Sequence, residues 1–124
     1  MRVFLCGPMT GLPEFNYPAF HAMAARLRAR GFTVESPAEN PTPACGTWAA
    51  YMAMSIPQML TCDVVATLDG WIKSSGARVE LREARTHGKG IVRACDLVAL
   101  SNAPPHSGAP NFLALFEARK VPEN

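Results

Sequence analysis

Short apolar segments alternate with helical patterns along this 124-residue chain from its second residue onward, and this alternation constrains the fold more than any other feature. Residues 2–6 form a short, mostly apolar run ended by Gly-Pro, which is typical of a strand buried on both faces. Residues 20–27 then repeat apolar side chains at i, i+3, i+4 and i+7, which predicts a helix. Strands joined by helical crossovers pair in parallel, so the pattern predicts an α/β fold whose sheet is covered by helices on both faces.

The same alternation predicts the remaining elements and a single domain over residues 1–124. Further elements are expected, in chain order, at residues 32–35 (strand), 47–59 (helix), 63–68 (strand), 76–87 (helix), 90–93 (strand), 96–100 (strand) and 112–120 (helix). Pro57 should kink or split its helix, because proline lacks the backbone N–H and its ring crowds the preceding turn. Residues 36–46 contain three prolines and predict a long irregular loop that is placed to cover a site.

Composition indicates a globular protein and argues against several partners. The chain is 48% hydrophobic and 18% charged, which argues against disorder. Its net charge of +2 is too small to favour a nucleic-acid polymer or a membrane surface as a partner. No apolar run approaches the roughly 18 residues that span a bilayer, and the apolar start is too short for a signal peptide. We therefore expect a cytoplasmic protein.

The cysteines and histidines give no signature of a metal or redox site. The four cysteines are too widely spaced for a Cys-x-x-Cys pair, and the histidines do not recur at ligand spacing, so no metal is expected. Reduced, mostly buried thiols are the simplest interpretation. The loop after the first strand is not GxGxxG, which disfavours a dinucleotide site. It also lacks the hydroxyl-rich sequence of an FMN loop, and no cofactor is expected.

Two loops at the carboxyl ends of strands qualify as site loops, because ligands of open parallel sheets bind there. In residues 7–11, glycines allow close backbone approach and amides can receive an anion. Residues 69–76 lead into the helix that carries Glu80, which lies about 40° from the edge of that helix's apolar stripe and so borders the buried side. The alternative is a solvated basic face, on which Glu80 pairs with an arginine or favours the helix dipole.

Three segments together resemble the nucleoside 2-deoxyribosyltransferase superfamily, and in particular a small branch that is common in phage genomes. The segments are GPMTGLPEFNYPAF, SPAEN and CDVVATLDGWIKSSGARVELREARTHGK, and the resemblance covers residues 2 to about 92. It implies a flavodoxin-like three-layer sandwich with a parallel, roughly five-stranded sheet in the order 2-1-3-4-5. It also implies a homodimer or larger homo-oligomer, in which a neighbouring subunit helps to close each site, and a location in the host cytoplasm if a phage encodes the protein.

The resemblance implies a role for Glu80, which matches the nucleophilic glutamate on the helix after the third strand. Glu80 would attack C1′ of a 2′-deoxynucleoside or its 5′-monophosphate and form a covalent glycosyl ester. Attack by water on this ester makes the protein a hydrolase, and attack by a second base makes it a transferase. The residues implied to contact the substrate are Gly7, Pro8, Met9, Tyr17, Asp69, Ser74 and Gly76.

Several of these assignments have alternatives. Asp69 binds base or sugar, or it only caps its loop. Tyr17 or Phe15 can stack on a base, and three further aromatic residues are more often part of a core or an interface than a platform for a base: Trp48, Tyr51 and Trp71.

The sequence departs from the transferase pattern at three positions. Phe4 stands where transferases commonly carry a tyrosine whose hydroxyl orients the nucleophile, and Ser55 and Ser74 stand where they carry acidic residues. A serine at the latter position is similar to relatives that hydrolyse nucleoside monophosphates, because a hydroxyl tolerates a nearby phosphate that a carboxylate repels. Hydrolysis is therefore slightly favoured over transfer. The alternative from another class is a non-catalytic nucleotide-binding or sensing module with the same fold.

Overall fold

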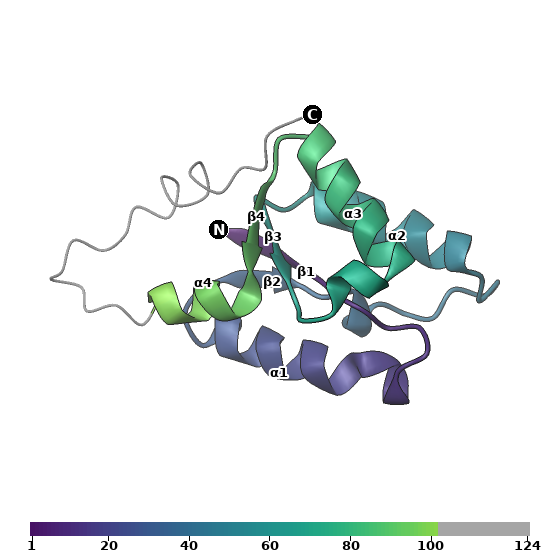
Figure 1. Cartoon of the computed structure of the whole chain (residues 1–124), viewed down its shortest axis with the longest axis horizontal. Coiled ribbons are helices and arrows are strands. Elements are labelled where there is room, and N and C mark those ends of the chain that lie inside the picture. Colours follow the sequence, from purple (N-terminus) through teal and green to yellow (C-terminus); the bar gives the residue numbers. More distant parts are fainter. Residues whose placement is uncertain (102–124) are drawn as a thin grey trace, which may run out of the picture.

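The computed structural model of the chain describes residues 1–101, which form a parallel four-stranded sheet between two layers of helices. The strands are β1 (Arg2–Cys6), β2 (Thr33–Glu35), β3 (Val64–Thr67) and β4 (Gly90–Arg93), and their order across the sheet is β2-β1-β3-β4 (Figure 1). All three pairings are parallel. This architecture confirms the predicted α/β class, and it is compatible with a flavodoxin-like fold.

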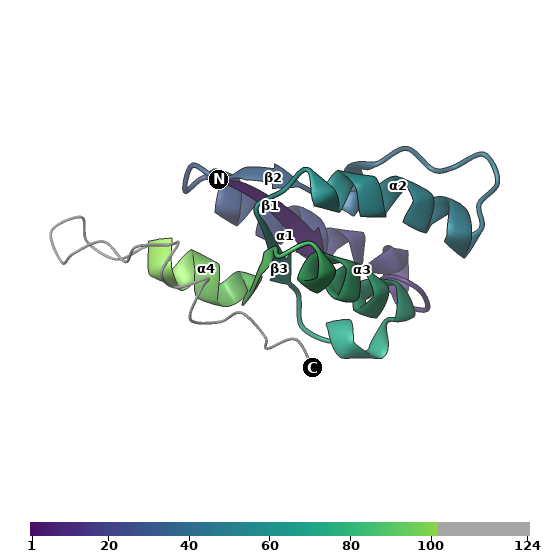
Figure 2. The same ribbon diagram turned by 90° about the horizontal axis from the view of Figure 1, so that it is seen from above.

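Two helices cover each face of the sheet (Figures 1 and 2). The helices are α1 (Tyr17–Arg28), α2 (Trp48–Leu60), α3 (Ser75–Thr86) and α4 (Ala94–Ser101). Helices α1 and α4 pack with the sheet in one apolar core, and α2 and α3 pack with it in the other. Three 3₁₀ turns, η1 (Pro13–Asn16), η2 (Pro37–Glu39) and η3 (Trp71–Lys73), lie in the connecting loops.

The central strand β1 separates the two cores. Val3 and Leu5 point toward α1 and α4, whereas Phe4 and Cys6 point toward α2 and α3. All four side chains are fully buried. Because side chains alternate along a strand, a strand buried on both faces reads as a continuous apolar run, as the sequence of residues 2–6 indicated.

The helices α2 and α3 begin at side-chain caps. Thr47 Oγ1 accepts a hydrogen bond from the Ala50 N–H at 3.1 Å, and Ser74 Oγ accepts one from the Ala77 N–H at 3.2 Å. Each bond satisfies a backbone donor that has no partner within the helix. Both caps therefore fix where the chain turns from a loop at the sheet edge into a helix.

The predicted strand at residues 96–100 is wrong, because these residues belong to α4. The buried side chains of this segment are Ala94, Leu97 and Val98, and their spacing of i, i+3 and i+4 is helical. Asp96 in the first turn also favours the helix dipole. The described sheet therefore has four strands, in the predicted order as far as it extends, and the predicted helix at 112–120 lies outside the described residues.

Two smaller expectations also need correction. Helix α2 continues through Pro57, so the proline does not split it. Pro57 and Ala53 are both exposed, and water can therefore hydrate the Ala53 carbonyl that loses its usual donor. All four thiols are free, but only those of Cys6 and Cys62 are buried, while the other two are exposed.

Within residues 1–101, no helix has the length and apolar character needed to cross a membrane.

Candidate functional site

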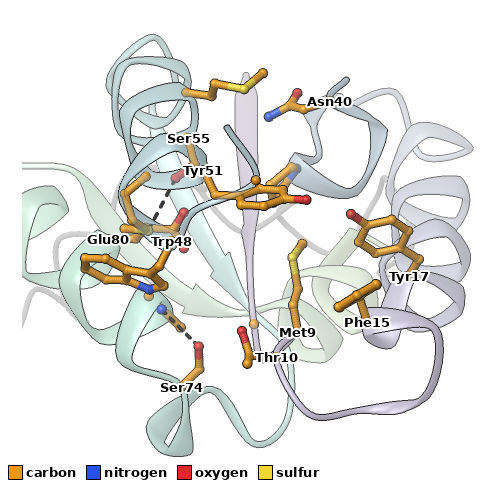
Figure 3. A pocket seen from close by; sticks show the side chains of 17 residues that line it. Met9, Thr10, Phe15, Tyr17, Asn40, Trp48, Tyr51, Ser55, Ser74 and Glu80 are labelled. Carbon is orange, nitrogen blue, oxygen red and sulfur yellow. Dashed lines mark hydrogen bonds between the residues drawn. The ribbon is translucent and has the colours of Figure 1, made fainter. Parts of the chain in front are cut away.

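A pocket of about 410 Å³ opens at the carboxyl edge of the sheet, on the side covered by α2 and α3. Its walls come from the loop after β1, the loop that precedes α2, the first turns of α2 and the start of α3 (Figure 3). Six of the eight residues predicted to form the site line this pocket: Gly7, Met9, Tyr17, Ser74, Gly76 and Glu80. The two loops singled out in the sequence therefore meet at one cavity, together with α2.

Glu80 forms part of the pocket wall although its side chain is almost fully buried. The residue is 6% exposed, and it lies beside the buried stripe of Ala77, Leu81 and Ala84 on α3. The Cys6 thiol donates a hydrogen bond to Glu80 Oε1, with an Sγ to Oε1 distance of 3.4 Å. Within residues 1–101, no ion pair to Glu80 is found, so the alternative of a solvated pairing with an arginine is not what the structure contains.

Burial raises the pKa of Glu80 to about 7. Burial is the largest cause, because a carboxylate loses its hydration there, while interactions with the Ser55 hydroxyl and the Cys6 thiol act in the lowering direction. A carboxyl group with this pKa is ionised in about half of the molecules at neutral pH. It can therefore exchange a proton, or act as a carboxylate, in the range where most enzymes work.

Pro8 and Asp69 are the two predicted site residues that do not line the pocket. The Pro8 carbonyl accepts a hydrogen bond from Asn16 Nδ2 at 3.0 Å and so fixes the shape of the loop. The Asp69 side chain is 95% exposed and lies 4.0 Å from Arg93 Nη2. It lines a second cavity of about 310 Å³.

Gly7 has a packing role in addition to its place in the pocket wall. A Cβ atom at this position would lie 2.8 Å from Leu68 Cβ, which is closer than real Cβ contacts. Only glycine lets the end of β1 pass the end of β3 at this distance. The residue therefore shapes the floor of the pocket.

Residues 1–93 match a protein family that is described as a domain of unknown function (DUF4406). The chain belongs to this family. No curated protein matches the chain. The matched part of the DUF4406 domain contains all four described strands, the helices α1 to α3 and every residue that lines the pocket.

Aromatic side chains form much of the mouth of the pocket in this DUF4406 domain. Phe15, Trp48 and Tyr51 are 60%, 49% and 38% exposed, and all three line the pocket. Figure 3 shows Trp48 on the side of Glu80 and Ser74, with Phe15 and Tyr17 on the opposite side. Exposed aromatic side chains around a cavity are suited to stack on a planar ligand or to pack against a partner. Trp71, in contrast, packs against the apolar core.

The loop that carries Phe15 has an unusual backbone. Glu14, Phe15 and Asn16 have φ angles of 52°, 53° and 61°, in the left-handed region. Each such residue costs roughly 1–2 kcal/mol when it is not glycine. The bond from Asn16 to the Pro8 carbonyl helps to hold this turn, which places an aromatic side chain at the pocket mouth.

The loop before α2 covers one side of the pocket, as the sequence predicted. Arg28 donates two hydrogen bonds of 2.7 Å to the Glu39 carboxylate, and this partner lowers the pKa of Glu39. Asn40 and Gln58 exchange hydrogen bonds of 2.7 and 3.0 Å between their side-chain amides. These two pairs attach the loop to α1 and α2, and Asn40 itself lines the pocket.

The described walls of the pocket contain one carboxyl group and no lysine, arginine or histidine. The basic residues of α3, at positions 78, 82 and 85, are exposed and do not line it. In the described part of the chain, no group of three or more His, Cys, Asp or Glu side chains is suited to hold a metal ion. The start of α3 also lines the pocket, through Ser74, Gly76 and Ala77, and a helix N-terminus carries a partial positive charge.

Sequence reasoning missed Cys6 as a member of the site. It treated the cysteines as buried thiols, and for Cys6 the structure adds a hydrogen bond to the candidate nucleophile. The period of two along β1 was the available signal, because it places Cys6 on the same face as Phe4, at the strand end nearest the site. Phe4 itself is fully buried in the apolar core, and it supplies no donor.

Proposed function

We propose that this DUF4406 domain cleaves the N-glycosidic bond of a 2′-deoxynucleoside or its 5′-monophosphate, with Glu80 as the nucleophile. The observation that carries the proposal is a single buried carboxyl group, Glu80, in the wall of a cavity of about 410 Å³ whose mouth is aromatic. Cavities of a few hundred Å³ suit small ligands. The aromatic side chains offer surfaces on which a base can stack.

The reaction uses the ionised form of Glu80. The carboxylate attacks C1′ of the deoxyribose, the bond from C1′ to the base nitrogen breaks, and the base leaves with the bonding electrons and takes up a proton. Water then attacks C1′ of the glycosyl ester, which releases deoxyribose, or its 5-phosphate, and regenerates the carboxylate. The carboxylate also stabilises the positive charge that develops on the sugar in both steps.

The start of α3 supports a 5′-phosphate as part of the substrate. A phosphate at a helix N-terminus accepts hydrogen bonds from backbone N–H groups, and Ser74 at this place does not repel it. The described walls offer no cationic side chain for the same purpose. We therefore keep both the nucleoside and its monophosphate as substrates, and we let the assay separate them.

A second copy of the chain at the pocket mouth is part of the proposal. The exposed aromatic residues Phe15, Trp48 and Tyr51 form an apolar rim of the kind that packs against a partner or a ligand. The strand order β2-β1-β3-β4 likewise supports a flavodoxin-like fold.

The test is release of free base from a panel of deoxynucleosides and their monophosphates, measured by chromatography with and without an acceptor base. Glu80→Gln should lower base release at least about a thousandfold, because the nucleophile is lost. Glu83→Gln, on the same helix but half exposed, is the matched control and should retain activity. Base release without acceptor identifies a hydrolase, and new nucleosides that form only with acceptor identify a transferase.

Two outcomes would contradict the proposal. Equal base release by Glu80→Gln and Glu83→Gln would remove Glu80 from the chemistry. Saturable binding of nucleotides without cleavage of any member of the panel would instead identify a binding or sensing module.

A further inference from the structure

Cys6 occupies a position that the proposed reaction does not by itself explain. It is fully buried at the carboxyl end of β1, and its Sγ atom lies 3.4 Å from Glu80 Oε1 and 3.5 Å from the Ala77 carbonyl oxygen. The carbonyl belongs to the same helix as Glu80, one turn earlier. The thiol therefore joins the central strand to α3 at the carboxyl group that faces the pocket.

Among the side chains of β1, only that of Cys6 is placed to donate a hydrogen bond to Glu80. Arg2, Phe4 and Cys6 share one face of the strand, because side chains alternate. Arg2 lies at the opposite end and bonds Thr61. Phe4 is apolar and packs in the core.

We infer that Cys6 is a positioning residue for Glu80: its thiol donates a hydrogen bond to one carboxylate oxygen, which holds the carboxylate in place and stabilises it while the other oxygen faces the pocket. A buried carboxylate requires donors, because it has lost those of water. The consequence for turnover rests on the proposed function, whereas the hydrogen bond and its effect on ionisation do not.

The surroundings of both groups support this role. Burial, with the nearby Glu80 charge as a further cause, raises the pKa of the Cys6 thiol well above its usual value. The thiol thus keeps its proton over the range in which Glu80 ionises, and it acts as a donor and not as a nucleophile. The Ser55 hydroxyl is the other group that acts to lower the pKa of Glu80, and the phenols of Tyr17 and Tyr51 line the same pocket.

The first test measures the ionisation of Glu80 itself, by ¹³C NMR titration of its side-chain carboxyl group, assigned with Glu80→Gln. Cys6→Ala removes the donor and should lower the acid ionisation constant of Glu80 by roughly tenfold. Cys6→Ser keeps a donor and should restore most of the wild-type value. Cys62→Ala is the matched control, because Cys62 is also buried in this core but bonds the Gln58 carbonyl.

A second measurement needs no variant of Cys6. Hydrogen bonding to an ionised acceptor is stronger than to a neutral one, so the S–H Raman band of one thiol should move to lower frequency between about pH 5.5 and about pH 8. The same band should stay fixed in Glu80→Gln. Identical titrations in Cys6→Ala and Cys62→Ala, or an S–H band that ignores the charge of Glu80, would overturn the inference.

Kinetics separate a failure of this inference from a failure of the proposed function. In Cys6→Ala, kcat at pH 7 should fall by about three- to tenfold at nearly constant KM and should recover at high pH, where ionisation is complete. A changed ionisation constant with no cleavage of any nucleoside would leave the hydrogen bond standing and refute the proposed function. Cleavage that is equally fast in Cys6→Ala and Cys62→Ala would refute the positioning role alone.

Discussion

Two of the cavities formed by the described residues lie at the carboxyl ends of the strands, and they differ in the burial of the carboxyl group that each contains. The larger cavity, of about 410 Å³, lies on the side of α2 and α3 and contains Glu80, which is 6% exposed. The smaller one, of about 310 Å³, lies by the end of β3 and contains Asp69, whose side chain is 95% exposed. The two residues are only eleven positions apart in the chain.

This difference shows that the burial of the carboxyl group, and not merely its presence, distinguishes the candidate site from the second cavity. Asp69 keeps its hydration and has a cation, Arg93, at 4.0 Å. The Glu80 carboxyl group has lost its hydration and interacts with one thiol and one hydroxyl, and burial raises its pKa to about 7. Ionisation of a carboxyl group that is buried like that of Glu80 lowers the free energy of unfolding, and such a cost is typical of functional sites.

The largest effect expected from the burial of Glu80 is on stability. The folded-state pKa of Glu80, about 7, exceeds the value of roughly 4.3 for an unfolded chain, so the native state binds more protons between these values. The free energy of unfolding therefore falls as pH rises through this window. Glu80→Gln cannot ionise, and it should be more stable than the wild type by up to about 3 kcal/mol at pH 8.

Urea unfolding at about pH 5 and about pH 8 measures this difference. The gain of Glu80→Gln over the wild type should fall to about 1 kcal/mol at the lower pH, where Glu80 is protonated in the native state but still largely ionised in the unfolded chain. Glu83→Gln, on the exposed side of the same helix, should show no such gain. A gain that is equal at both pH values would mean that the ionisation of Glu80 is not the cause.

The next effect is on the pH dependence of turnover. Because the proposed reaction uses Glu80 in its ionised form, base release at limiting substrate should rise with pH through about 7 and be about a hundredfold slower at pH 5 than at pH 8. A rate that does not depend on the ionisation of Glu80 would instead stay flat over this range. The measurement is kcat/KM from pH 5 to pH 9, and a rate that falls as pH rises would assign Glu80 as a proton donor.

Local sequence patterns predicted most of the fold. The doubly buried run of β1 and the helical spacing of α1 and α3 depend on near neighbours along the chain. The strand predicted at residues 96–100 was wrong, because a short apolar run suits a strand or a buried helix equally. Their buried positions appear only once α4 is packed on α1.

The candidate site was predictable where two loops at strand ends converge, as for Glu80 and Ser74. The site was not predictable where a side chain contacts a residue on a different helix or strand. The bond from Cys6 to Glu80 joins residues 74 positions apart, and the exposure of Asp69 depends on which side of β3 its loop turns. No periodicity within one segment contains that information.

A smaller effect is expected at the aromatic rim. Trp48→Ala should weaken the binding of a deoxynucleoside or its monophosphate to the larger cavity by about tenfold, because stacking of a base on an aromatic side chain contributes about 1–3 kcal/mol. Stability should change little, since Trp48 is 49% exposed. The measurement is calorimetry with a non-cleaving variant, Glu80→Gln.

The control for this prediction is Ile72→Ala. Ile72 is 62% exposed and lines neither cavity, so its replacement removes exposed apolar surface without touching a ligand. Equal affinities of the two variants would show that Trp48 does not contact the base.

The smallest effect is expected in the second cavity. Asp69→Asn removes a charge whose partner, Arg93, is itself 62% exposed and lies at the 4.0 Å limit of an ion pair. Such pairs are screened by water and salt, and many contribute nothing measurable, so turnover and the equilibrium constant for unfolding should each change by less than about twofold. Parallel assays of base release and urea unfolding check both numbers. A loss of turnover of tenfold or more would contradict the distinction between the cavities, because it would require Asp69 to reach the substrate from the far side of β3.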